Sequence, residues 1–217
     1  MSSEPVDGAP VLDRRAKRRQ ATIEEILDIA EQVMAEDGVN GLSLAEVARR
    51  LGVQPPSLYK YFGSLMAVYD ALFRRGQDAN LEALRSAMAG AEPGLAALRA
   101  GLEASCRWGL SNAHLAQLLF WRPVPNFVPS AESMAASHAM VDLQRRALAD
   151  AAAANELGPG ADTDEALYLV SIFVSGIIGQ AIANEPELPW GTGRFTPLFA
   201  KLGDILTATY PPEARPR

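Results

Sequence analysis

Positive charge and hydrogen-bonding side chains gather in two short stretches near the amino terminus. The first is a basic run made of Arg14, Arg15, Lys17, Arg18 and Arg19. The second is the segment 54–61, QPPSLYKY, which mixes amide, hydroxyl, aromatic and cationic side chains. Arginine and lysine pair with phosphate oxygens, while amides and hydroxyls hydrogen-bond the edges of bases. The two stretches indicate nucleic-acid binding; the alternative for the basic run is a solvated tail that binds nothing in particular.

A short, sharply bounded helix precedes the second stretch. Ser43 is predicted to cap this helix: its hydroxyl accepts from the amide three residues on, and Glu46 reaches back in a capping box. Leu42 and Val47 are placed for a hydrophobic staple across the cap. The apolar stripe of the helix consists of Leu44, Val47, Ala48 and Leu51. Gly52 supplies the left-handed residue that ends the helix.

A second short helix follows and presents an outward face. Pro55 fits its first turn, because the amide that proline lacks would have no partner there. The apolar spacing continues through Leu58, Tyr61 and Phe62. The side chains left facing outward are Gln54, Pro56, Ser57, Tyr59 and Lys60. Such a polar, aromatic and cationic face suits a major groove. A two-helix corner of this kind also occurs in helical proteins that bind no nucleic acid.

With the amphipathic helix upstream, which includes Ala30 and Met34 and stops near Gly38, the pattern resembles the TetR family of bacterial one-component regulators. The likeness runs from Ile26 to Leu72 and includes the GVNGLS turn at 38–43, the LGV turn at 51–53 and the LYKYFGS segment at 58–64. It covers about the first third of the chain. The resemblance implies a three-helix DNA-binding domain, a helical ligand-binding and dimerisation domain, and an operator-binding homodimer that a small molecule releases or alters.

The resemblance also implies roles for single residues. Ser43 would cap the second helix and donate to a phosphate, and residues 54–57 would begin the recognition helix. Tyr59 and Tyr61 would touch sugar-phosphate or thymine methyl groups, and Lys60 would meet a phosphate. The DNA-contact set predicted in this way is Arg14, Arg15, Lys17, Arg18, Arg19, Ser43, Gln54, Pro55, Pro56, Ser57, Tyr59, Lys60 and Tyr61.

The chain departs from the family pattern at two positions. Gln54 stands where the family usually has a small hydroxyl or similar cap. Leu65 stands where a lysine normally meets a phosphate at the start of the fourth helix. One backbone contact is therefore in doubt at Leu65, and the basic run is a candidate to replace it.

Length and charge fit two domains of one all-α chain. The 217 residues are 48% hydrophobic and carry a net charge of -6. Residues 14–76 hold ten Lys or Arg against eight Asp or Glu, whereas residues 77–217 hold ten against fifteen. The acidic balance thus lies in the second part, and DNA binding depends on the local patch. The predicted parts are a disordered tail over 1–13, a helix-turn-helix domain with its basic arm over 14–64, and a helical ligand-binding and dimerisation domain over 65–217. One cysteine, Cys106, and no charged-then-apolar leader predict the cytoplasm.

The second part continues in helical periodicity with no strand pattern. Helices are expected over about 65–89, 94–110, 113–121, 130–155 and 195–209, with Asp162 or Thr163 capping a further helix. The segment 167–183 lacks charge, but it is shorter than the roughly 20 residues of a membrane span, so a soluble interpretation is favoured. By resemblance this helix and the last one form the dimer interface, for which the predicted residues are Ser171, Ser175, Gly179, Leu198, Leu202 and Ile205.

A ligand cavity is predicted from the aromatic and sulfur side chains of the middle helices. The chosen residues are Trp108, Phe120, Trp121, Phe127, Met134, His138, Met140 and Phe173, with Arg122, His114 and Glu103 as possible polar contacts. Each one alone is more simply core packing. Together they indicate an apolar or aromatic small molecule. Cys106 among apolar residues behaves as a small hydrophobe rather than a sensor.

An enzyme is disfavoured. With two histidines and one cysteine, the chain has no zinc-binding His-Glu-x-x-His, no glycine-rich phosphate loop and no Gly-x-Ser-x-Gly elbow. No cofactor and no metal are expected. The predicted function is a DNA-binding transcriptional regulator, a repressor by resemblance, that binds a palindromic operator as a homodimer. The alternative is a helical adaptor that binds only protein, which would leave the basic run and the proline-opened helix unexplained.

Overall fold

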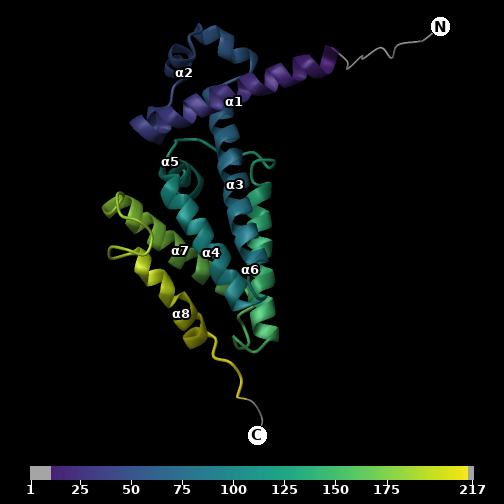
Figure 1. Cartoon of the computed structure of the whole chain (residues 1–217), viewed down its shortest axis with the longest axis vertical. Helices are drawn as coiled ribbons and strands as arrows, with labels where there is room; N and C mark the ends of the chain where they lie inside the picture. The colour runs from purple at the N-terminus through teal and green to yellow at the C-terminus, as the bar shows by residue number, and fades with distance from the viewer. Residues whose placement is uncertain (1–10, 215–217) are drawn as a thin grey trace, which may run out of the picture. The chain divides into compact units, whose positions relative to one another are not determined.

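The computed structural model describes residues 11–214, and every regular element in that range is helical (Figure 1). The predicted all-α fold class is therefore confirmed. The elements are α1 (Val11–Asp37), η1 (Val39–Gly41), α2 (Leu44–Leu51), η2 (Pro55–Lys60), α3 (Leu65–Ala89), α4 (Leu95–Ser111), α5 (Ala113–Ala116), η3 (Gln117–Trp121), α6 (Ala135–Ala153), α7 (Asp164–Asn184), η4 (Thr196–Lys201) and α8 (Leu202–Thr209).

The chain divides into two compact units between Tyr69 and Asp70, inside α3. The sequence placed this boundary between residues 64 and 65. The first turns of α3 belong to the first unit because the buried Tyr69 hydroxyl donates to the carbonyl of Val39 at 2.7 Å. The predicted tail over 1–13 overlaps α1, which begins at Val11. Residues 1–10 lie outside the described residues.

The first unit packs α2 and the short helix η1 against α1. Its core side chains are Ile26, Leu27, Ala30, Val33, Met34, Val39, Leu42, Val47, Ala48, Leu58 and Phe62. The predicted helix ends are confirmed: the Ser43 side chain accepts from the amide of Glu46, Gly52 has a φ of 72°, and Pro55 lies in the first turn of η2. Local capping and a small shared core together fix the angle between α2 and η2.

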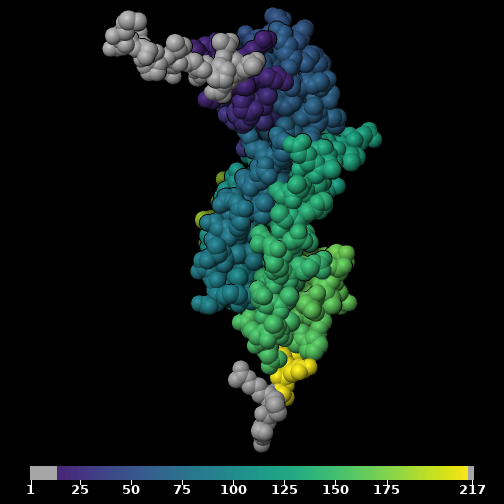
Figure 2. Space-filling view, turned by 90° about the vertical axis from the view of Figure 1, so that its right-hand side faces the viewer, coloured from purple at the N-terminus to yellow at the C-terminus, as the bar shows by residue number. Residues whose placement is uncertain are grey.

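The second unit is built around α4, which packs on α6, α7 and α8 (Figure 1). α3 approaches α4 closely at Gly101, where an added Cβ would lie 2.5 Å from the Met88 side chain. Figure 2 shows the face on which α3 and α6 run side by side. A hydrophobic core cluster joins α4, α6, α7 and α8 through residues such as Leu98, Leu102, Leu148, Val170, Ile178, Leu202 and Leu206, and Met88 of α3 packs against it.

α7 is long and apolar enough to span a membrane by length and composition alone. It begins at the predicted cap, where the Thr163 hydroxyl accepts from the amide of Ala166 at 3.5 Å. One side of the helix, including Val170, Val174 and Ile178, is buried against the unit's core. One side of this apolar helix is therefore buried in the subunit, whereas the other side is exposed.

The segment before the Arg122-Pro123 pair adopts a wider backbone than a regular α-helix. α5 continues directly into η3, a single turn of π-helix over Gln117–Trp121. The turn ends at Arg122, whose φ of 44° is left-handed. The predicted end of this helix near residue 121 is thus confirmed. Single π-turns occur preferentially where side chains must be redirected at a functional site.

Candidate functional site

The outward face of η2 is the first candidate site. Leu58 and Phe62 are buried and anchor the element, whereas Gln54, Pro56, Tyr59 and Lys60 are exposed. The exposed fraction of Tyr59 is 57%, which is large for an aromatic side chain with no binding role. The remaining members of the predicted face, Pro55, Ser57 and Tyr61, are half-buried. DNA contact by these side chains stays a prediction.

Arg19 is partly used inside the first unit, which the sequence did not reveal. Its Nη1 donates to the carbonyl of Lys60 at 3.1 Å. Its guanidinium also lies over the Tyr61 ring, 5.3 Å from the centroid. A cation is favoured at the carbonyl end of a helix and over an aromatic face. Arg19 therefore ties α1 to the end of η2, in addition to any phosphate contact.

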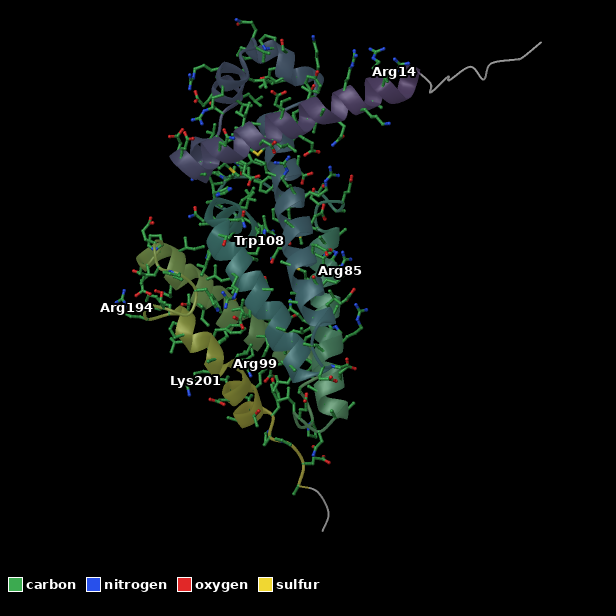
Figure 3. The ribbon with its side chains drawn as sticks, viewed as in Figure 1. Arg14, Arg85, Arg99, Trp108, Arg194 and Lys201 are labelled. Carbon is green, nitrogen blue, oxygen red and sulfur yellow. The ribbon has the colours of Figure 1, made fainter. Side chains whose placement is uncertain are left out.

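The rest of the basic arm lies along the exposed side of α1. Arg14, Arg15, Lys17 and Arg18 all have exposed side chains. Figure 3 shows Arg14 near the amino-terminal end of that helix. These residues form a row of positive charge in the same unit as η2. Such a row suits phosphate contacts on either side of a groove.

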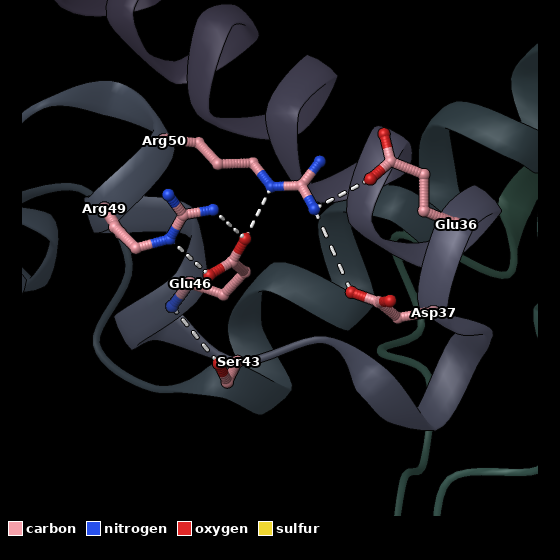
Figure 4. Close-up of polar contacts among 6 residues, drawn as sticks. All are labelled: Glu36, Asp37, Ser43, Glu46, Arg49 and Arg50. Atoms are coloured by element: carbon pink, nitrogen blue, oxygen red, sulfur yellow. Dashed lines mark hydrogen bonds and ion pairs between the residues drawn. The ribbon is translucent and has the colours of Figure 1, made fainter.

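A charged network fixes α2 on α1 (Figure 4). The Glu46 carboxylate accepts from Arg49 Nε at 2.8 Å and from Arg50 Nε at 2.7 Å. Arg50 then pairs with Glu36 on α1 at 2.9 Å. Hydrogen bonds from Arg49 and then Arg50 lower the pKa of Glu46 to about 2. The network corrects the predicted capping box: Ser43 caps α2 as expected, but the Glu46 side chain turns to the arginines.

Ser64 and Leu65 open α3 without a cation. The Ser64 hydroxyl accepts from the amide of Ala67 at 3.2 Å, which caps the helix. Leu65 is half-buried at the position where the family usually has a lysine. The side chain at this position therefore carries no positive charge with which to contact a DNA phosphate, as the sequence indicated.

The second candidate site is a cavity of about 540 Å³ within the second unit. Its apolar walls come from α4, η3, α6 and α7 and consist of Leu102, Leu119, Phe120, Met140, Val141, Leu167, Val174 and Ile178. Its polar lining includes Gln77, Asn80, Ser105, Ser137 and Gln144. The volume lies within the range of about 300–1,000 Å³ that is usual for small-molecule sites.

Two amide side chains on α3 form the most buried polar part of this cavity. Gln77 and Asn80 are 4% and 1% exposed. Within the described residues, neither Gln77 Oε1 nor Asn80 Oδ1 has a hydrogen-bond partner. Ser105 on α4 is also buried beside the cavity. Native proteins leave few buried polar atoms unpaired, and each such atom calls for an explanation.

Charged groups line the exposed edge of the cavity. Arg145 on α6 pairs with Asp164 on α7 at 2.6 Å, and both side chains are largely exposed. Arg122 is exposed as well, with its guanidinium 5.8 Å from the centroid of the Phe73 ring. The cavity thus runs from a charged rim to a neutral, polar interior.

The predicted pocket residues are only partly brought together. Phe120, Met140 and Arg122 line the cavity. Trp121 instead lines a separate groove of about 510 Å³ along α7. The other five predicted residues, Trp108, Phe127, Met134, His138 and Phe173, are absent from the lining of this cavity, and ligand contact by them stays a prediction.

The packing shows where four of these five residues lie instead. Phe127 is buried edge-on against Phe73, with ring centroids 6.0 Å apart. His138 faces solvent from α6. Phe173 packs against the core cluster, and Trp108 lies half-buried on α4 (Figure 3). Aromatic character alone did not distinguish core from cavity.

A sequence signal did exist for the two amides. Phe73, Gln77, Asn80 and Leu84 follow one another at helical spacing, and both end residues of this series are fully buried. Polar residues on an apolar stripe are unusual enough to mark a buried polar site. The prediction overlooked them because it searched for aromatic residues.

The predicted dimer residues lie on or beside an exposed face of α7 and the last helices. Ser171 is exposed, Ser175 and Gly179 are half-buried, and the apolar neighbours Tyr168 and Ile172 are 65% and 71% exposed. Of the residues predicted from η4 and α8, Leu198 is exposed and Ile205 half-buried. Leu202 is fully buried in the core of its own subunit and is removed from the predicted interface.

Comparisons with known proteins agree with this description. Residues 26–72 match the family model described as bacterial regulatory proteins, tetR family. YobS of Bacillus subtilis, an uncharacterized HTH-type transcriptional regulator, is 41% identical over 51 residues, which cover 24% of this chain and 27% of that protein. The match therefore spans about a quarter of that relative's length.

Solved structures extend the likeness over nearly the whole chain. A protein with unknown function from Rhodococcus sp. RHA1 has 25% identity and a TM-score of 0.71, covering 96% of this chain and 99% of that one. FadR from Bacillus subtilis, in complex with stearoyl-CoA, has 15% identity and a TM-score of 0.63, covering 84% and 96%. This second likeness concerns the fold alone.

The fold and the two sites define an all-α helix-turn-helix protein whose second unit encloses a cavity. Residues 26–72 contain the Ser43 cap, the Gly52 end of α2, and η2. This segment matches the TetR family of bacterial regulatory proteins, and nearly the whole chain shares its fold with the Rhodococcus protein.

Proposed function

We propose that the chain is a DNA-binding repressor that acts as a homodimer on a palindromic operator and responds to a small molecule with a large apolar part. One observation carries the proposal. η2 presents Gln54, Pro56, Tyr59 and Lys60 to solvent, while Leu58 and Phe62 hold the element firmly on the unit's core. A rigid element with an exposed polar and aromatic face is what base reading in a major groove requires.

The charge of the first unit supports DNA as the partner. Arg14, Arg15, Lys17 and Arg18 are exposed on α1, in the same unit as Lys60 on η2. Contacts from these side chains to phosphates would fix the register of the protein on the duplex, and η2 would read the bases. Such a protein would act where the DNA is, in the cytoplasm of a bacterium.

The homodimer is supported by the exposed face of α7. Tyr168 and Ile172 are large apolar residues one helical turn apart, and Gly176 continues the same line with open space around it. Exposed apolar patches of this kind mark protein interfaces. A twofold dimer would present two copies of η2 to half-sites about 34–36 Å apart.

The cavity supports a small-molecule effector. Its volume and apolar walls fit a ligand that is mostly hydrocarbon. The structurally similar FadR of Bacillus subtilis was solved with stearoyl-CoA, a molecule with a long apolar chain. We propose repression rather than activation because a protein that only occupies DNA can block polymerase without further contacts.

A gel-shift assay with the DNA immediately upstream of the chain's own gene tests the proposal. We expect retardation that depends on sequence and weakens as salt rises. The variants Tyr59→Ala and Lys60→Ala should weaken retardation by about tenfold each, with little change in melting temperature because both residues are exposed. Lys201→Ala, an exposed lysine in the second unit, is the matched control.

The outcome also separates a regulator from a helical adaptor. No retardation of any duplex, or an equal loss with Lys201→Ala, would contradict the proposal and favour an adaptor that binds only protein. A parallel loss of melting temperature in Tyr59→Ala would show that Tyr59 belongs to the core.

A further inference from the structure

We propose that Gln77 and Asn80 bind a neutral hydrogen-bonding group, a hydroxyl or a carboxamide, at the inner end of an otherwise aliphatic ligand. The inference deepens the proposed function, since it assigns the chemistry of the effector that occupies the cavity. It depends on the cavity and its two amides, and not on how the first unit binds DNA.

The two amides are placed as a pair. They stand three residues apart on α3, so their side chains leave the same face of the helix. Both line the cavity, and both are more than nine-tenths buried. The acceptor atoms Gln77 Oε1 and Asn80 Oδ1 have no partner within the described residues. A buried acceptor without a partner lowers stability, whereas an apolar residue of the same shape would not. A ligand that supplies the missing hydrogen bonds explains why amides stand here.

The charge of the lining selects a neutral group. The side chains at the buried end, Gln77, Asn80 and Ser105, are all uncharged. Arg122 and Arg145 lie at the exposed rim, and Arg145 is already paired with Asp164. A carboxylate carried to the inner end would lose its hydration without gaining a cation, which is costly. A ligand's anionic group would therefore stay at the rim.

The hydrogen-bonding capacity of amides narrows the group further. A carboxamide side chain offers an acceptor oxygen and a donor NH2, and a half-turn about its last bond exchanges them. The NH2 of a carboxamide can donate to both amide oxygens at once, whereas a hydroxyl donates to one oxygen and accepts from the NH2 of the other amide after such a half-turn. The walls around them, such as Leu102, Leu119 and Ile178, accept only hydrocarbon.

Calorimetric titration of the purified full chain with three probes of equal chain length tests this assignment. The probes are 1-decanol, decanamide and decanoate. We expect 1-decanol and decanamide to bind at least about tenfold more tightly than decanoate, because a neutral group gains buried hydrogen bonds whereas an uncompensated charge loses its hydration.

The double variant Gln77→Met/Asn80→Leu keeps side-chain size and removes both amides. It should weaken 1-decanol and decanamide binding by about tenfold. Its melting temperature should be equal to or higher than that of the unaltered chain, because buried unpaired polar atoms are gone. Gln144→Met, which removes a less buried amide from the same cavity, is the matched control and should change binding little.

Three outcomes would overturn the assignment. They are equal or tighter binding of decanoate, unchanged affinity of 1-decanol in the double variant, and failure of all three probes to bind. A lowered melting temperature in the double variant would show that the amides stabilise the subunit itself. Because the titration needs no DNA, a failed gel shift and a failed titration would refute different proposals: the first refutes the regulator, and the second the ligand class.

Discussion

The two units of the chain treat polar groups in opposite ways. In the first unit, the polar side chains near η2 are either exposed, like Tyr59, or partnered at the surface, like Glu46 with its two arginines. In the second unit, Gln77 and Asn80 are buried with acceptor atoms unpaired. In the first unit these polar groups are thus already hydrated or paired in the free protein. The second unit contains two buried amide acceptor atoms without a hydrogen-bond partner among the described residues, and we propose that a ligand supplies one.

The comparison predicts how the units respond to change. Substitutions on the first unit's surface should alter binding and leave stability almost unchanged. Substitution of the amides of the second unit by apolar residues should weaken ligand binding without lowering stability. The exposed face of α7 belongs to the second unit. Substitutions there should nevertheless alter binding, in this case dimerisation, and leave the stability of the subunit almost unchanged.

The largest effect is expected from Ile172→Arg on α7. Ile172 is 71% exposed in the subunit, so arginine there should fold without difficulty. If this face is the dimer interface, an unpaired charge buried in it costs about 3–5 kcal/mol, so the dimer should dissociate. Sedimentation equilibrium measures the change. Val128→Arg, at an 80% exposed loop position, is the control. A variant that remains dimeric would remove α7 from the interface.

A smaller effect is expected from Arg19→Ala. Loss of the hydrogen bond to the Lys60 carbonyl and of the contact with Tyr61 should loosen the end of η2 and weaken DNA binding by about tenfold. Arg18→Ala is the comparison, since Arg18 is exposed on the same helix.

The salt dependence of binding distinguishes the two roles. A lost phosphate contact reduces the slope of log affinity against log salt by about 1, whereas a lost positioning contact leaves that slope unchanged. We expect the reduced slope for Arg18→Ala alone. An equal reduction of the slope in both variants would show that Arg19 also contacts a DNA phosphate.

Gly52→Ala should destabilise the chain by about 1 kcal/mol. Gly52 ends α2 with a φ of 72°, and an added Cβ would meet nothing within 4 Å, so the cost is backbone strain alone. Gly63→Ala is the matched control, because that position also has open space but no positive φ. Urea unfolding measures both. Equal effects would mean that the left-handed end of α2 is not what stabilises the turn.

The smallest effect concerns Glu46 and pH. Its pKa falls from 4.5 to about 2 in the folded chain, through hydrogen bonds from Arg49 and Arg50. A lowered folded pKa gives stability that is present above the unfolded value and lost as pH falls from 4.5 through about 2. Relative to Glu46→Gln, the unaltered chain should therefore lose melting temperature faster in that window. Parallel curves would show that the network contributes nothing to stability.

Sequence reasoning succeeded where structure follows from local chemistry. Ser43, Gly52, Pro55 and Thr163 mark helix ends through their own conformational preferences, and the structure has an end at each of them. The bounds of α3 at Leu65 and Ala89 were predicted in the same way.

It failed where several partners compete for one side chain, and where the outcome depends on which distant residues meet. The spacing of Glu46 allowed a capping box, but two nearby arginines compete successfully for its carboxylate. Arg19 reaches a carbonyl that lies 41 residues further along the chain. Leu202 fits an apolar stripe equally well on an interface or in a core. No local pattern shows which side of a buried helix faces a void.

The π-turn at Gln117–Trp121 places adjacent residues at two different hollows of the second unit. Phe120 lines the cavity, and Trp121 lines the groove beside Gly179, where an added Cβ would lie 3.1 Å from the indole. Their rings also meet edge-on, with centroids 6.0 Å apart. A ligand in the cavity that displaces the Phe120 ring should also displace the Trp121 ring. The fluorescence of the Trp121 indole, which lies in the groove outside the cavity, should therefore change when the cavity is occupied.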